Sequence, residues 1–136
     1  MATDVNFWAI LVAGIAYFVL GGVWYAVVWR KPWTRALALE PDVKEQAEKD
    51  FPKALVCHLL SGILTAVVLG FIIRTAGANT FLDGVIYGLW VWLAFGFTIN
   101  LNSFMFEKRP APVFLTNGGF YLAAFAVVGG ILAGWQ

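Results

Sequence analysis

The sequence predicts an all-α integral membrane protein, built as an up-down bundle of four transmembrane helices. Hydrophobic residues make up 61% of the 136 residues and charged residues 12%, and the hydrophobic residues gather in four long runs. A helix needs about 20 such residues to cross a hydrocarbon core of roughly 30 Å. A soluble domain would instead alternate apolar and polar residues with a period of about 3.6 or 2. The length fits a single transmembrane domain, residues 1–136.

The first predicted span covers residues 6–29, and the sizeable hydrophilic loop that follows it covers residues 30–52. The span ends in a stretch rich in glycine and tryptophan. The amphipathic rings of Trp24 and Tyr25 are typical of the level of the lipid headgroups. Within the loop, Pro41 predicts the first turn of a short surface helix, because proline is favoured at that position.

The other three predicted spans cover residues 53–73, 81–106 and 113–135. Pro52 opens the second span, since proline is tolerated in the first turn of a helix. Pro110 marks the break before the fourth span. The connections between these spans are short, and short connections make consecutive helices antiparallel neighbours.

The distribution of basic residues predicts the orientation of the bundle. Of nine Lys and Arg residues, eight fall on the side of the first loop and the third connection, whereas the opposite side holds Arg74. Lys and Arg are enriched in cytoplasmic loops. We therefore expect loop 30–52 to be cytoplasmic and both termini to be non-cytoplasmic. The expected location is the cytoplasmic (inner) membrane of a bacterium.

Small residues recur four positions apart in every span, which predicts close packing of helices. Without an aqueous driving force, membrane helices associate where small side chains let their backbones approach. This packing joins helices either within one chain or between copies. The glycines expected to carry it are Gly22, Gly62, Gly84, Gly88 and Gly130.

Polar side chains inside the spans are the candidate functional residues, because they are costly in hydrocarbon. At about 1.5 Å per residue, every span places at least one such group roughly 5–10 Å below the cytoplasmic surface. This polar layer has two readings. Its members hydrogen-bond one another and fix the register of the bundle, or they line a water-filled vestibule in which His58 also relays protons. The layer consists of Trp24, Tyr25, His58, Asn100 and Asn117.

The motifs of catalytic and metal sites are missing from the sequence. It contains no nucleophile elbow, phosphate loop, HExxH pattern or paired carboxylates. His58 has no Cys, Asp or second His nearby, which makes it a poor metal site. No basic cluster points to nucleic acid. We therefore expect a protein that is not an enzyme and has no catalytic residues, bound metal or cofactor, and no nucleic-acid partner.

Several segments carry a resemblance to a known family. They are the Trp24-Tyr25 pair, the Trp29-Arg30-Lys31-Pro32-Trp33 stretch, His58 early in the second span, and the stretches Phe106-Glu107-Lys108-Arg109 and Asn117-Gly118-Gly119-Phe120. In these segments the chain resembles the domain of unknown function 1761 family over nearly its whole length. The resemblance implies a small four-span membrane protein of bacteria and fungi. It implies no activity.

Two functions of different kinds remain open from the sequence. The first is a non-enzymatic component of the membrane, a homo-oligomer or an accessory subunit, with the lipid bilayer and other membrane subunits as its partners. The second is a small oligomeric transporter or channel with a polar vestibule near His58 in the cytoplasmic leaflet. Four helices barely enclose a pathway, so transport requires several copies.

Overall fold

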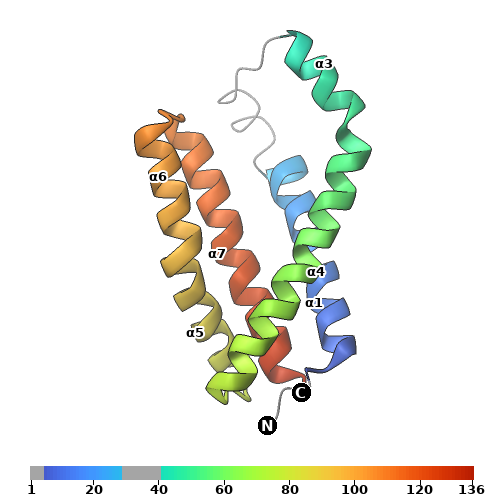
Figure 1. The fold of residues 1–136 in the computed structure, drawn as a ribbon, viewed down its shortest axis with the longest axis vertical. Helices are drawn as coiled ribbons and strands as arrows, with labels where there is room; N and C mark the ends of the chain where they lie inside the picture. Colours follow the sequence, from blue (N-terminus) through green and yellow to red (C-terminus); the bar gives the residue numbers. More distant parts are fainter. Residues whose placement is uncertain (1–4, 29–40) are drawn as a thin grey trace.

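The structure, a computed structural model, describes residues 5–28 and 41–136 (Figure 1). Within these residues every regular element is a helix. Four helical stretches are long and apolar enough to cross a membrane, which confirms the predicted all-α, four-span architecture. The elements are α1 (Phe7–Val23), η1 (Trp24–Val28), α3 (Pro41–Lys49), α4 (Phe51–Ala76), α5 (Phe81–Val91), η2 (Trp92–Phe97), α6 (Thr98–Phe106) and α7 (Ala111–Gly134).

Capping residues define the helix ends. The Asn6 side chain accepts a hydrogen bond of 3.0 Å from the backbone N–H of Trp8 and so caps α1. Thr80 caps α5 in the same way through the N–H of Asp83, at 3.1 Å. Gly77 ends α4 in the left-handed region, at φ 75°, where glycine carries no steric penalty. The connection between α4 and α5 is therefore a tight turn with both flanking helices capped.

Arg74 lies at this same end of the bundle, and it bonds to the end of α7. Its Nη1 donates to the Gln136 side chain at 2.8 Å, and Gln136 Nε2 donates to the backbone oxygen of Ala78 at 2.6 Å. Asp83 occupies the first turn of α5. A carboxylate there interacts favourably with the positive end of the helix dipole. Asp83 thus has a structural role in the cap of α5.

Helix α7 is the centre of the bundle. It packs against α1, α4 and α5, and α1 and α4 pack against each other as a pair. Consecutive helices α4 and α5 are scarcely in contact and diverge away from their connection (Figure 1). The prediction that a short connection makes consecutive helices neighbours is therefore wrong for α4 and α5, because α5 packs on α7 instead of on α4.

Glycines explain why α5 packs closely along α7. A Cβ on Gly84 would overlap the backbone oxygen of Gly129, and a Cβ on Gly129 would overlap that of Gly84. A Cβ on Gly88 would similarly overlap the backbone oxygen of Phe125. The two backbones touch directly along this line. The Gly84/Gly88 stripe is thus used inside the chain.

Two other predicted packing glycines also serve contacts within the chain. A Cβ on Gly62 would lie 2.8 Å from the backbone oxygen of Gly14, so α1 and α4 also meet backbone to backbone. A Cβ on Gly130 would lie 2.6 Å from the ring of Phe81. A side chain at Gly62 would push the backbones of α1 and α4 apart, whereas one at Gly130 would displace the Phe81 ring.

Gly22 does not fit the predicted packing set. It is exposed, and a Cβ there would meet no described atom within 4 Å. Its neighbour Gly21 is buried, and a Cβ on Gly21 would overlap the ring of His58. The prediction was one residue off because consecutive positions on a helix face about 100° apart, and the sequence does not show which of two adjacent glycines faces the partner helix.

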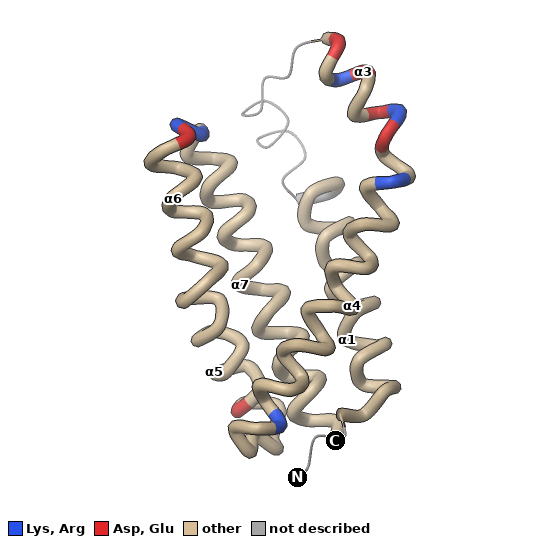
Figure 2. The backbone as a smooth tube through the Cα atoms, in the orientation of Figure 1, with Lys and Arg blue, Asp and Glu red and all other residues tan. Residues whose placement is uncertain are grey.

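Charged residues gather at the two ends of the described bundle (Figure 2). One end carries α3, the start of α4 and the connection between α6 and α7, whereas Arg74 and Asp83 lie at the other. The ends of the second, third and fourth spans thus coincide with the charged levels. The Trp29-Arg30-Lys31-Pro32-Trp33 stretch and most of the first loop lie outside the described residues.

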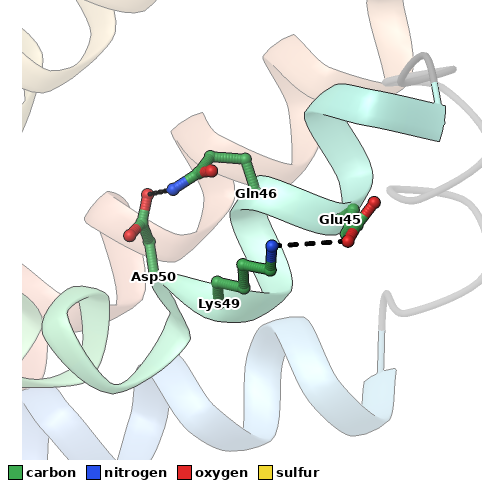
Figure 3. Close-up of polar contacts among 4 residues, drawn as sticks. All are labelled: Glu45, Gln46, Lys49 and Asp50. Atoms are coloured by element: carbon green, nitrogen blue, oxygen red, sulfur yellow. Dashed lines mark hydrogen bonds and ion pairs between the residues drawn. The ribbon is translucent and has the colours of Figure 1, made fainter.

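The short helix α3 begins at Pro41, and every one of its residues is exposed. Lys49 pairs with Glu45 at 3.4 Å, and Gln46 donates to Asp50 at 3.0 Å (Figure 3). Pairs spaced i,i+4 on an exposed helix contribute only about 0.2–0.5 kcal/mol each. Helix α3 is therefore a solvated extension of α4.

Candidate functional site

Three consecutive residues of α7 accept hydrogen bonds from aromatic donors on two other segments. Trp24 Nε1 donates to the backbone oxygen of Thr116 at 2.9 Å, and the Tyr25 hydroxyl donates to Asn117 Oδ1 at 2.6 Å. Trp92 Nε1 donates to the backbone oxygen of Gly118 at 2.9 Å. The second turn of α7 thus joins the end of the first span to the middle of the third.

Local backbone geometry makes these bonds possible. A helical carbonyl has a second lone pair that stays available after its intrahelical bond. Gly119 carries no side chain, so the Trp24 ring lies 3.0 Å from where its Cβ would be. Trp24 and Trp92 each begin a π-helical turn, η1 and η2. Such turns insert a residue into an α-helix and re-aim its side chains, and they are frequent at functional sites.

A polar cavity of about 280 Å³ lies beside this acceptor segment, between α6 and α7. Three apolar side chains form part of its wall: Phe104, Val113 and Phe114. The polar side chains that line it are Asn100, Ser103, Glu107, Arg109 and Asn117. Two members of the predicted polar layer, Asn100 and Asn117, therefore share one cavity.

Hydrogen bonds within the chain fix the orientation of both amides in the cavity. Asn100 Nδ2 donates to the backbone oxygen of Gly96 at 2.7 Å, which leaves its side-chain oxygen as the remaining acceptor. Asn117 Oδ1 accepts from Tyr25, which leaves its NH₂ group as the remaining donor. Neither remaining group is a buried atom without a partner. The cavity therefore offers one oriented donor and one oriented acceptor.

An ion pair lies at the charged end of this cavity. Arg109 Nε donates to Glu107 Oε2 at 2.9 Å, and the two side chains are 51% and 57% exposed. Lys108 between them adopts a positive φ of 56°. A non-glycine residue in this region is uncommon and marks a constrained turn. The turn holds opposite charges together on one wall of the cavity.

His58 lies away from the cavity, in an aromatic environment between α1 and α7. Its ring centroid is 5.0 Å from that of Tyr17, 5.7 Å from that of Phe18 and 5.8 Å from that of Phe120. Its Nε2 atom is buried and makes no hydrogen bond of good geometry with a described residue, although the Tyr17 backbone is close enough to interact with the ring.

The predicted polar layer therefore divides into two parts. Tyr25, Asn117 and Asn100 belong to one connected group with the cavity, and Trp24 bonds to the same turn of α7. Phe120 separates His58 from this group, since its ring contacts both His58 and Tyr25. Within the described residues, His58 therefore does not line the polar cavity that Asn100 and Asn117 share. The polar cavity belongs to the α6–α7 side.

Sequence reasoning missed the role of Trp92 as a donor to α7 and the roles of Thr116 and Gly118 as acceptors. Trp92 shares a helical stripe with Gly84, Gly88 and Gly96. That stripe is the available signal, because α7 is the helix that the glycines contact. Every residue has a backbone carbonyl, so the sequence does not show which carbonyls accept a side-chain hydrogen bond. Only the fold shows it.

Among residues 5–28 and 41–136, no three His, Cys, Asp or Glu side chains gather as they do around a metal ion. Cys57 is exposed on α4. The groups brought together at the cavity are amides, a hydroxyl and one ion pair. Such groups bind and orient a polar ligand through hydrogen bonds and charge.

The fold and this site define a small four-span helical membrane protein with a polar cavity at one end. The chain belongs to the family described as protein of unknown function (DUF1761), whose model matches residues 8–133. No curated protein and no solved structure matches it. The family resemblance stated from the sequence is thereby confirmed. Two of its segments, Trp24-Tyr25 and the one that begins at Asn117, are in direct contact.

Proposed function

We propose that the protein is a non-enzymatic membrane component that works as a homo-oligomer. The observation that carries this proposal is Trp90 on α5. Its side chain is 63% exposed, and its indole N–H makes no hydrogen bond with a described residue. Trp90 is the tenth residue of the span Phe81–Phe106, or about 14 Å from its start at 1.5 Å per residue. This is near the middle of the bilayer.

Tryptophan normally lies at the membrane interface, where its N–H meets water and headgroups. In the hydrocarbon core an unsatisfied N–H is unfavourable. An apolar hollow of about 430 Å³, with Trp90 as part of its wall, opens on the α5–η2 surface and reaches Leu122 of α7. A protruding ring next to a hollow is self-complementary across a two-fold axis. Two copies would each insert Trp90 into the hollow of the other.

The architecture supports the same proposal. Segment α5–η2–α6 packs on α7 alone apart from its connection to α4, so most of its surface is left uncovered by the described chain. The Gly84/Gly88 stripe is used within the chain. A partner copy must therefore use another face of α5, and Trp90 lies on such a face. An accessory role in a complex with a different membrane subunit would use the same surface.

The test compares Trp90→Leu with Trp8→Leu. Trp8 is equally exposed, at 65%, but lies at the end of α1. Native mass measurements in lipid nanodiscs should show a dimer for the wild type and for Trp8→Leu. Trp90→Leu should weaken dimerisation at least about tenfold, a loss of about 1.4 kcal/mol. A wild type that is a single chain at all lipid dilutions would rule out the homo-oligomer and leave the accessory-subunit role.

A transporter or channel is the second candidate, and the polar cavity favours it. The cavity lies at one end of the bundle. Towards the other end, α5 and α7 meet backbone to backbone at Gly84 and Gly129. A pathway would therefore have to run between copies. Solute flux into proteoliposomes that is lost in Asn117→Ala and retained in Trp8→Leu would support transport over a purely structural role.

A further inference from the structure

We propose that the cavity between α6 and α7 binds a phosphoethanolamine group, carried by a membrane lipid or free in solution. This inference does not depend on the homo-oligomer, because the cavity and the Trp90 surface are different parts of the molecule. It concerns the ligand of a site built from amides, a hydroxyl and an ion pair.

The charges in the cavity favour a ligand that carries both signs. Glu107 and Arg109 both line it, and they are joined through a single pair of atoms, Arg109 Nε and Glu107 Oε2. The other guanidinium N–H groups and the second carboxylate oxygen remain available. An anion alone would meet repulsion from Glu107, and a cation alone would meet repulsion from Arg109. A zwitterion places its phosphate on Arg109 and its ammonium on Glu107.

The hydrogen-bonding groups deeper in the cavity match the same pair of ligand groups. The NH₂ group of Asn117 is a donor for a phosphate oxygen, and its orientation is held by Tyr25. The side-chain oxygen of Asn100 is an acceptor for an ammonium N–H, and its orientation is held by the Gly96 carbonyl. A primary ammonium has three N–H donors, whereas a trimethylated one has none. The site therefore favours ethanolamine over choline.

The remaining wall is suited to a group that continues into hydrocarbon. Phe104 and Phe114 line the cavity, with ring centroids 5.2 Å apart, and Val113 lies beside them. The ion pair is exposed at the charged end of the bundle (Figure 2), the level at which lipid headgroups lie. A phospholipid can thus place its headgroup in the cavity while its chains stay in the bilayer. A free phosphoethanolamine reaches the same groups from water.

The test uses the full chain in detergent and native mass spectrometry with three lipids of identical acyl chains. Phosphatidylethanolamine should bind at least about tenfold more tightly than phosphatidylglycerol, which lacks the cation. It should also exceed phosphatidylcholine, whose cation has no N–H. Free phosphoethanolamine serves as the competitor. If it displaces the lipid, the group is also taken from water; if it does not, the ligand is the lipid.

Single substitutions test separately the residues expected to bind the ammonium and those expected to bind the phosphate. Glu107→Gln and Asn100→Ala should each reduce the preference for phosphatidylethanolamine, because they remove partners of the ammonium. Arg109→Gln and Asn117→Ala should weaken binding of all three lipids, because they remove partners of the phosphate. Glu45→Gln and Lys49→Gln change charges on the exposed helix α3 and should leave binding unchanged.

Tyr25→Phe tests a positioning role, since it removes the group that orients Asn117 without touching the ligand. It should weaken binding of the three lipids less than Asn117→Ala does.

Two results would overturn the assignment. One is equal binding of the three lipids by the wild type. The other is a preference for phosphatidylethanolamine that survives both Glu107→Gln and Asn100→Ala, each shown by circular dichroism to be folded. If a variant fails to fold, the comparison of the three lipids on the wild type still decides, together with protection of a cysteine placed at Ser103 from a maleimide by phosphatidylethanolamine. Failure of this proposal leaves the Trp90 interface untouched.

Discussion

The Tyr25 hydroxyl donates a hydrogen bond of 2.6 Å to Asn117 Oδ1, which lies 92 positions further along the chain. This bond joins the end of the first span to the second turn of the last span. The neighbouring residue Trp24 bonds to the adjacent Thr116 in parallel. Two segments that carry the family resemblance therefore meet at one point, and that point borders the polar cavity.

Tyr25→Phe is expected to destabilise the fold modestly. Hydrogen bonds between membrane helices contribute about 0.6–2 kcal/mol each, and the substitution removes one such bond while keeping the ring. Tyr87→Phe is the matched control, because the Tyr87 hydroxyl makes no hydrogen bond with a described residue. Reversible unfolding in mixed micelles measures both. Equal effects of the two substitutions would show that the bond to Asn117 contributes nothing.

Gly84→Leu is expected to disrupt the packing of α5 on α7. A side chain at this position would enter the backbone of Gly129, and overpacking typically costs about 1–3 kcal/mol or more. Gly22→Leu is the control, since Gly22 is exposed and has no described atom within 4 Å of a Cβ. Unfolding in mixed micelles should separate the two variants by at least about 2 kcal/mol.

The Gly84→Leu substitution also distinguishes packing of α5 on α7 within one chain from packing between copies. In a Cys57→Ala background, cysteines placed at Phe81 and Gly134 allow crosslinking of α5 to α7 in a single chain, because a Cβ on Gly134 would lie 3.4 Å from the Phe81 Cβ. Gly84→Leu should reduce this crosslink even at high lipid dilution, where dimers dissociate. If the crosslink persists and dimerisation alone is lost, the glycine stripe belongs to an interface between copies.

The four-span architecture was predictable from the sequence because it depends on composition and run length. Pro41, Pro52 and Pro110 indicated helix boundaries for local reasons, and the structure places them at the starts of α3, α4 and α7. Such features require no knowledge of which helices meet. The packing of α5 on α7 does require it, since α4 is closer to α5 in the chain.

The candidate site was predictable only in part. Depth along a helix follows from residue counting, which brought Tyr25, Asn100 and Asn117 to one level. Rotation about the helix axis does not follow from counting, and it decides that His58 faces Tyr17 and Phe120 instead of the cavity. The π-helical turns at Trp24 and Trp92 change this rotation locally.

Topology is the next prediction. If Lys and Arg mark the cytoplasmic side, the end of the bundle that carries α3 faces the cytoplasm and Gln136 faces outward. In a Cys57→Ala background, an impermeant maleimide added to intact cells should label a cysteine at Gln136. A cysteine at Gln46 on the exposed helix α3 should react only after lysis. Labelling of the Gln46 position in intact cells would reverse the orientation.

The last prediction concerns His58. Replacing it with leucine removes a buried Nε2 that lacks a well-formed hydrogen bond, and leaving such an atom unsatisfied costs about 1–3 kcal/mol. The same replacement loses ring contacts with Tyr17 and Phe120, which contribute about 0.5–1.5 kcal/mol each.

These two effects of the His58→Leu substitution oppose each other, so it should change the free energy of unfolding by less than about 1 kcal/mol in either direction. Asn117→Leu is the comparison, because it removes the Oδ1 atom that accepts from the Tyr25 hydroxyl and eliminates no unsatisfied buried atom in exchange. It should destabilise the fold by about 1–3 kcal/mol. A larger cost for His58→Leu than for Asn117→Leu, measured in the same micelles, would mean that His58 has a hydrogen-bond partner beyond the described chain, from water or from a second copy.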